Sequence, residues 1–187
     1  LSSAAPDYPA PAPDLNCGLQ ARYKFDNDAN DASGNGNHLS VGAGTTSYVK
    51  DRKSNCNRAF RFNGSTYLKT NTSISLESPR ATKRLTISYW QKAEGTEMPI
   101  LAKSSNVTNG LFNVHNNPSG ILVNFNGKTP ASNFAVTPAV TQNTWHQYTL
   151  VCRNDSLFVY LNGASKGANV LSATYTFDFD EPLEIGR

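Results

Sequence analysis

Residues 143–163, NTWHQYTLVCRNDSLFVYLNG, decide the fold class of this chain. Tyr148, Leu150 and Cys152 recur at every second position, which is the period of a strand with one buried face. A second strand is expected over residues 156–162, and Asn162-Gly163 supplies the positive φ angles that a tight turn needs. The stretch therefore predicts antiparallel β structure.

The same signals continue outward in both directions. Leu85, Ile87 and Tyr89 share one predicted face, opposite Thr86, Ser88 and Trp90. No segment of ten residues follows the 3.6-residue period of a helix, so the chain is predicted to be an all-β sandwich or jelly roll. The predicted strands are residues 19–25, 58–63, 66–69, 85–92, 99–103, 111–115, 120–125, 145–152, 156–162 and 183–186.

Length and charge limit the classes of partner. The chain has 187 residues, 38% of them hydrophobic, which suits one domain with a single core. A net charge of +3 without a basic run argues against nucleic acid, and no apolar stretch approaches the roughly 20 residues that a membrane helix needs. Residues 1–16 hold four of the ten prolines and are predicted to form a linker or tail before a domain at 17–187. Leu1 is not an initiator Met, and we expect a segment to have been removed before it.

Five motifs in sequence order resemble the laminin G-like, concanavalin A-like jelly-roll domains of secreted and cell-surface proteins. They are YKFDNDANDASGNGNHLSV, RAFRFNGSTYLKT, LTISYWQKA, ILAKS and the stretch of residues 143–163, followed by LEIGR at the end. The resemblance covers residues 18–187. It implies two stacked antiparallel sheets, a secreted or cell-surface location, and binding of glycans or surface proteins.

The resemblance also draws attention to the last strand. Members of this family continue past the LEIGR element into a final strand beside the first one, and here Arg187 ends the sequence. An open edge beside residues 19–25 would leave backbone groups unpaired. We expect residues 19–25 to pair by β-augmentation with a strand from a cleaved C-terminal piece or a neighbouring subunit. The alternatives are that the tail folds back or that the edge stays open.

An acidic and amide-rich loop at residues 26–35 is a candidate cation site. Asp26, Asp28 and Asp31 offer the hard oxygen ligands that Ca²⁺ prefers, and similar domains hold a structural cation at this position. The alternative is an Asx turn in which Asp31 accepts backbone N–H groups.

Three cysteines leave at least one thiol unpaired. We expect Cys17 and Cys56 to form a disulfide, because a secreted domain tolerates few exposed thiols; the alternative is two free thiols. Cys152 is predicted to be a buried, inert thiol.

Catalytic signals are weak. A glycosidase needs two carboxylates across a groove, and the nearest candidates are Asp178 and Asp180, beside a strand that Pro182 interrupts. His38, His115 and His146 are scattered without metal-ligand spacing. No catalytic residue is therefore assigned.

Aromatic residues are expected to serve mostly as core, and four Asn-x-Ser/Thr acceptors occur. The aromatic residues expected in strands are Tyr67, Trp90, Trp145, Tyr148 and Tyr160, and the acceptors are Asn63, Asn71, Asn106 and Asn154. The sequence predicts a non-catalytic extracellular recognition or adhesion module. The alternative is a structural subunit of an extracellular matrix, sheath or filament, and the third reading is a glycoside hydrolase.

Overall fold

The computed structural model describes most of the chain from residue 14 onward. The described residues are 14, 16–71, 74–77, 82–95, 98–103, 112–117, 120–125, 134–136, 141–170 and 181–187. Within them, one 3-10 helix, η1, spans Ile74–Glu77. The strands are β1 (Ser40–Ala43), β2 (Tyr48–Val49), β3 (Ala59–Phe60), β4 (Tyr67–Lys69), β5 (Arg84–Lys92), β6 (Met98–Lys103), β7 (Phe112–Asn117), β8 (Gly120–Phe125), β9 (Phe134–Val136), β10 (Trp145–Arg153), β11 (Ser156–Leu161), β12 (Ala164–Val170) and β13 (Leu183–Ile185).

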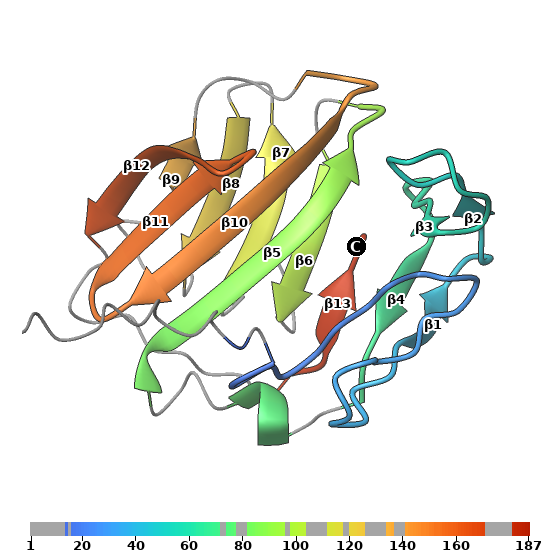
Figure 1. Ribbon diagram of the computed structural model, residues 1–187, viewed down its shortest axis with the longest axis horizontal. Helices are drawn as coiled ribbons and strands as arrows, with labels where there is room; N and C mark the ends of the chain where they lie inside the picture. Colours follow the sequence, from blue (N-terminus) through green and yellow to red (C-terminus); the bar gives the residue numbers. More distant parts are fainter. Residues whose placement is uncertain are drawn as a thin grey trace, which may run out of the picture.

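Two sheets face each other, as Figure 1 shows. The larger sheet has the strand order β1-β4-β13-β6-β7-β8-β9, and the smaller has the order β12-β11-β10-β5. Every pairing within them is antiparallel. A short β2-β3 ladder lies beside the larger sheet. The predicted class, an all-β antiparallel sandwich, is confirmed.

The main core lies between the two sheets. Strands β7 and β8 contribute one side of it, and strands β10 and β11 contribute the other. The buried members are Val114, Ile121, Val123, Tyr148, Leu150, Cys152, Leu157 and Val159. Alternation places these side chains on the inner faces, and the prediction that Cys152 is a buried thiol is confirmed.

A second, smaller core lies at the β1-β4-β13 end of the larger sheet. Its buried residues are Leu39, Phe60 and Leu68, and aromatic rings close it over. The ring centroids of Phe60 and Phe62 are 4.7 Å apart, and those of Phe60 and Tyr48 are 5.3 Å apart. Tyr23 and Phe25 pack on the same cluster, so the segment at residues 19–25 is held by its alternate aromatic side chains.

The predicted strand at residues 19–25 is wrong. This segment contains one isolated bridge, between Tyr23 and Asp31, and no ladder. Its backbone is bonded instead to the loop that follows: Ala32 N–H donates to the Arg22 carbonyl at 2.8 Å. Side chains of that loop donate to two further carbonyls of the segment, those of Leu19 and Gln20. Apolar and polar side chains alternate along residues 19–25 because alternate side chains pack on the second core. This alternation does not reflect pairing in a sheet.

The hairpin turn of the opening stretch is confirmed by its backbone. Asn162 has a φ of 51° and Gly163 a φ of 80°, and they join β11 to β12. The sequence reading missed β12, because its seven residues, ASKGANV, are all exposed and carry no apolar alternation. It also missed the short strands β1, β2 and β9. The predicted strand at 58–63 is reduced to β3.

Candidate functional site

One face of the smaller sheet points away from the core, and we call it the outer face. It consists of the side chains that alternate with core residues on β5, β10 and β11. They are Arg84, Thr86, Ser88, Trp90, Lys92, Trp145, Gln147, Thr149, Val151, Arg153, Ser156, Phe158 and Tyr160. On β5 the pattern is strict, with exposed and partly buried residues alternating along all nine positions.

Trp90 is the exposed aromatic side chain of the outer face. Its side chain is 43% exposed, and the Arg52 guanidinium lies 4.3 Å from the centroid of its ring. The sequence analysis expected Trp90 to be core, and this is wrong. The signal was present, because Trp90 was placed opposite the apolar face of Leu85, Ile87 and Tyr89. Tyr148, in contrast, is buried as expected.

Hydroxyl and amide groups lie beside the aromatic residues. Ser88 and Thr149 sit opposite each other on β5 and β10, with their hydroxyl oxygens 3.0 Å apart. The Gln147 side-chain amide donates to the Ser88 hydroxyl at 3.4 Å. Aromatic rings next to hydroxyl and amide donors are the combination that sugar-binding surfaces use.

The charged residues on the strands of the smaller sheet are all basic. Strands β5, β10, β11 and β12 carry Arg84, Lys92, Arg153 and Lys166, and none of their residues is Asp or Glu. This surface therefore suits ligands that accept hydrogen bonds or carry negative charge.

The candidate cation loop at residues 26–35 is organised by Asp31. Its Oδ1 accepts the backbone N–H groups of Arg22 at 2.9 Å and Ser33 at 2.8 Å. Its Oδ2 accepts the Ser33 hydroxyl at 2.7 Å and the Asn37 N–H at 3.0 Å. Burial acts to raise the pKa of Asp31, but these hydrogen bonds outweigh it and lower the pKa below its ordinary value. Four donors occupy the four lone-pair positions of one carboxylate.

The other two candidate ligands point to separate partners. Asp28 accepts the Asn30 N–H at 2.9 Å, and Asp26 lies 3.5 Å from an Arg58 guanidinium nitrogen. Within the described residues no three His, Cys, Asp or Glu side chains come together as a metal site. The bonds of Asp31 match the alternative reading of this loop, an Asx turn. A calcium ion at Asp26, Asp28 and Asp31 stays a prediction.

The expected Cys17–Cys56 bond is not formed in this structure, where both thiols are free and exposed. The turn at residues 16–18 lies near η1, whereas the turn before β3 lies at the other end of the extended segment 19–25 (Figure 1).

Polar side chains also reach the inner face of the smaller sheet. Gln91 and His146 are register partners, as are Tyr89 and Tyr148, whose rings lie 5.5 Å apart. Burial raises the pKa of both tyrosines, that of Tyr148 to about 12. The His146 Nδ1 lies 3.2 Å from the Asn162 side-chain nitrogen, so this histidine orients the β11–β12 turn.

The remaining candidates divide between structural roles and the undescribed part of the chain. His38 accepts the Asp31 N–H through Nδ1 at 3.1 Å and so belongs to the turn. His115 lies on β7, away from His38 and His146 in the fold. Asp178, Asp180 and the acceptor Asn106 lie outside the described residues.

Two antiparallel sheets, packed face to face with one polar outer face, define a β-sandwich module of the lectin-like class. A profile of the concanavalin A-like lectin/glucanases superfamily matches residues 62–187, and the chain belongs to this superfamily. No curated protein sequence matches the chain.

Solved structures with similar folds include an arabinanase domain and the binding domains of two toxins. Domain 4 of AbnA, a GH43 extracellular arabinanase from Geobacillus stearothermophilus solved with arabinotriose, has a TM-score of 0.69 and 19% identity, covering 89% of this chain and 82% of that one. The binding domain of botulinum neurotoxin serotype D/C has a TM-score of 0.71 and 13% identity over 92% of this chain and 44% of that one. The binding domain of Paraclostridial Mosquitocidal Protein 1 has a TM-score of 0.66 and 16% identity over 84% and 41%. The TM-scores show a shared fold.

Within the described residues, none of the helical structure has the length and apolar character needed to cross a membrane.

Proposed function

We propose that this chain is a non-catalytic, extracellular recognition module that binds glycans through the outer face of its smaller sheet. The observation that carries the proposal is Trp90, an aromatic ring left 43% exposed on a sheet face that also presents the hydroxyl and amide groups of Ser88, Thr149 and Gln147. Exposed rings stack on the apolar faces of sugars, while the polar groups bind their hydroxyls.

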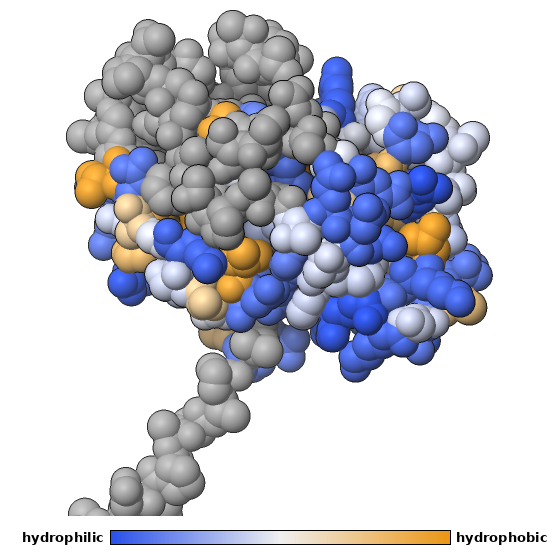
Figure 2. Space-filling view, turned by 90° about the horizontal axis from the view of Figure 1, so that it is seen from above, coloured by the Kyte–Doolittle hydropathy of each residue, from blue (hydrophilic) through white to orange (hydrophobic). Residues whose placement is uncertain are grey.

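The distribution of apolar surface supports a polar ligand. The exposed large apolar side chains of the described residues are Val41, Trp90 and Val170, which lie on three different strands. In Figure 2, which views the molecule from above relative to Figure 1, the described surface is mostly hydrophilic, with apolar side chains in small separate patches. A protein-docking surface usually has a larger contiguous apolar patch.

The absence of acidic residues from strands β5, β10, β11 and β12 supports a non-catalytic role for this face. Glycoside hydrolysis uses two carboxylates across the scissile bond, and these four strands supply none. The arabinanase domain solved with arabinotriose and the toxin binding domains give the same fold a precedent in binding.

A glycan array followed by titration calorimetry tests the proposal. We expect Trp90→Ala to lose binding to the glycans that the wild-type chain captures, by roughly tenfold or more if one stacked ring is worth about 1–3 kcal/mol. Val41→Ala is the matched control, because Val41 is equally exposed, at 43%, and lies on the other sheet. An array without hits, or equal binding by the two variants, would reject the outer face as a glycan site.

A second candidate function is strand addition in an extracellular assembly, which we infer at the β5 edge and not at residues 19–25, where the sequence predicted it. Strand β5 is an edge of the smaller sheet and pairs along its length with β10 alone among the described strands. A nine-residue edge can accept an extended segment of another chain by β-augmentation.

A further inference from the structure

A shallow pocket of about 560 Å³ lies at one end of the outer face, and two arginines are among the residues that line it. Arg84 of β5 and Arg153 of β10 are direct register partners in the antiparallel sheet. Side chains that oppose each other in this way lie on the same face, about 5 Å apart at their Cβ atoms. Both residues are exposed.

The two guanidinium groups are not neutralised within the sheet. The ion pairs among the described residues join other side chains: Arg58 with Asp26, Arg61 with Glu94, and Arg187 with Glu184. The nearest acidic residue along the chain is Glu77 of η1 for Arg84, and Asp155, in the turn between β10 and β11, for Arg153. Like charges directly opposite each other destabilise a sheet, and an anion bound between them would relieve that repulsion.

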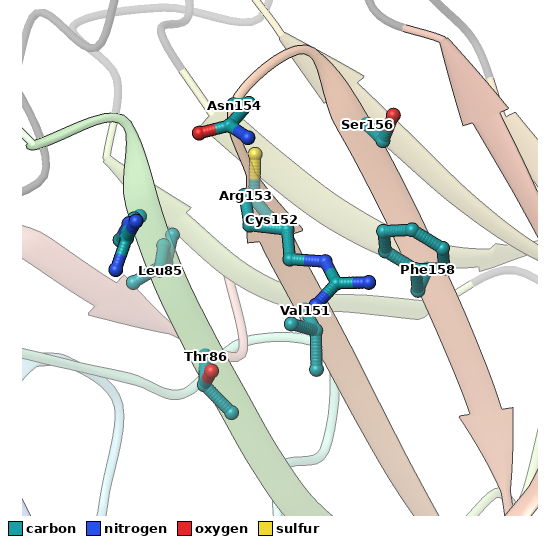
Figure 3. A pocket seen from close by; sticks show the side chains of 9 residues that line it. Leu85, Thr86, Val151, Cys152, Arg153, Asn154, Ser156 and Phe158 are labelled. Atoms are coloured by element: carbon teal, nitrogen blue, oxygen red, sulfur yellow. The ribbon is translucent and has the colours of Figure 1, made fainter.

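The pocket also holds one arginine in place. The Arg153 guanidinium lies 4.9 Å from the centroid of the Phe158 ring, and Figure 3 shows it reaching along the outer face toward that ring, beside Val151. A guanidinium stacked on an aromatic ring is pre-oriented, so less conformational entropy is lost when its planar fork binds an oxyanion. Thr86 and Ser156 add hydroxyl groups to the same pocket.

We propose that Arg84 and Arg153 bind the sulfate or carboxylate group of an acidic glycan, so that the module prefers anionic glycans to neutral ones. The planar fork of a guanidinium group matches the oxygen geometry of both groups. The inference rests on the proposed function, because it places an acidic substituent at one end of the face on which Trp90 contacts the glycan.

Titration calorimetry at physiological salt tests the inference with three probes of equal length: a heparin oligosaccharide, an oligogalacturonate and a neutral arabino-oligosaccharide. We expect at least one of the two anionic probes to bind more tightly than the neutral one. The double variant Arg84→Gln/Arg153→Gln should weaken that binding by about tenfold or more, since each lost charge-assisted contact is a large part of the binding energy. Lys24→Gln/Arg58→Gln removes the same charge away from the pocket and should weaken it by less than about threefold.

Two further measurements separate a forked contact from general attraction. Arg153→Lys keeps the charge and loses the planar fork, so we expect several-fold weaker binding. Sodium sulfate should compete with the anionic probe more strongly than sodium chloride at the same ionic strength. Equal losses in the two double variants, or no effect of Arg153→Lys together with equal competition by the two salts, would overturn the inference.

The outcomes also distinguish this inference from the proposed function. Neutral glycans that bind with dependence on Trp90 but not on the two arginines would leave the glycan module standing and overturn the acidic subsite. No binding by any glycan would overturn both. Folding of the double variant is checked by its melting temperature, which we expect to be equal to or above that of the wild-type chain because a like-charge pair is removed.

Discussion

Asp31 shows how a single carboxylate holds a segment that makes no sheet pairing. Its two oxygens take four hydrogen bonds, including one from Arg22 in the segment 19–25 and one from Asn37 in the following loop. The side chains of Asn35 and Asn37 donate to the carbonyls of Leu19 and Gln20, each at 2.8 Å. Side-chain hydrogen bonds therefore hold this segment in place, whereas a strand would be held by backbone hydrogen bonds to a neighbouring strand.

We predict that Asp31→Ala lowers the free energy of unfolding by roughly 2–4 kcal/mol, because it strands several partly buried donors at once. Asp28→Ala, which removes one exposed hydrogen bond, should cost less than about 1 kcal/mol. Urea unfolding followed by fluorescence measures both. Equal losses would show that the four bonds of Asp31 contribute no more than one exposed turn.

The same carboxylate sets a dependence of stability on pH. The pKa of Asp31 is lower in the folded chain than its unfolded value of about 3.9, so its stabilisation is complete above that unfolded value and is lost as pH falls through the folded pKa. Wild-type stability should therefore fall more steeply below about pH 4 than that of Asp31→Ala. Parallel slopes would assign the acid sensitivity to other groups.

Substitution of two glycines by alanine distinguishes the cost of backbone strain from the cost of steric overlap. Gly34 and Gly186 have φ angles of 95° and 84°, so either substitution to Ala places a side chain in the left-handed region. At Gly34 an added Cβ meets no atom within 4 Å, whereas at Gly186 it would fall 2.1 Å from the Phe62 ring. Gly34→Ala should cost about 1–2 kcal/mol and Gly186→Ala about 1–3 kcal/mol more. Thermal unfolding of both variants checks the order, and equal costs would contradict it.

Calcium is testable at the loop of residues 26–35. If a calcium ion would have to displace the N–H and O–H donors that fill the four lone-pair positions of Asp31, the melting temperature is expected to be the same in millimolar calcium and in a chelator. A structural ion present at a hundred times its Kd would instead add about 2.7 kcal/mol to stability. A calcium-dependent rise that Asp26→Asn and Asp28→Asn abolish would establish the site.

At the scale of elements, alternate residues of β10 lie in the main core, where they stabilise the fold, and on the outer face, where we propose that they bind the ligand. Leu150 is 2% exposed and lies in the main core, whereas its neighbour Thr149 belongs to the outer face and bonds Ser88. Leu150→Ala should cost about 2–5 kcal/mol, and Thr149→Ala less than about 1 kcal/mol. Denaturant unfolding compares them, and a Thr149 loss as large as that of Leu150 would mean that the outer face is covered by another part of the chain.

At the scale of the whole molecule, β5 is an edge strand of the smaller sheet, as is β12 at its other end. β10 is paired on both sides, with β5 and β11, whereas β5 has β10 as its one partner among the described strands. In the isolated chain, alternate amides of β5 should exchange with solvent faster than those of β10, which hydrogen exchange measures. Uniform protection of β5 equal to that of β10 would show that its edge is covered, by a second copy if the mass in solution is doubled.

Sequence periodicity predicted most strands of the sandwich, because a strand with one buried face has alternating apolar and polar residues within a few positions. The alternation of Tyr148, Leu150 and Cys152 located β10, and the same pattern located β5 and β11. The sequence did not predict β12, because all of its residues are exposed and show no apolar alternation. Residues 19–25 misled because packing on a core and pairing in a sheet produce the same alternation.

The candidate site was less visible, because alternation shows that two faces differ but not what covers each of them. Trp90 was correctly placed opposite Leu85, Ile87 and Tyr89, yet its exposure depends on what lies above the sheet. The pairing of Arg84 with Arg153 depends on the register between strands that are about 60 residues apart.

The sequence by itself determined the all-β class and the strands with a buried face, because hydrophobic period and turn residues act over a few neighbouring positions. The order of its motifs resembled the superfamily to which the chain belongs. The tertiary structure alone decided that residues 19–25 pack without pairing in a sheet. It also decided that Asp31 accepts three backbone N–H groups and one hydroxyl, and that Trp90, Arg84 and Arg153 lie on one surface. Those outcomes depend on which distant segments meet, and long-range packing and strand register set those contacts.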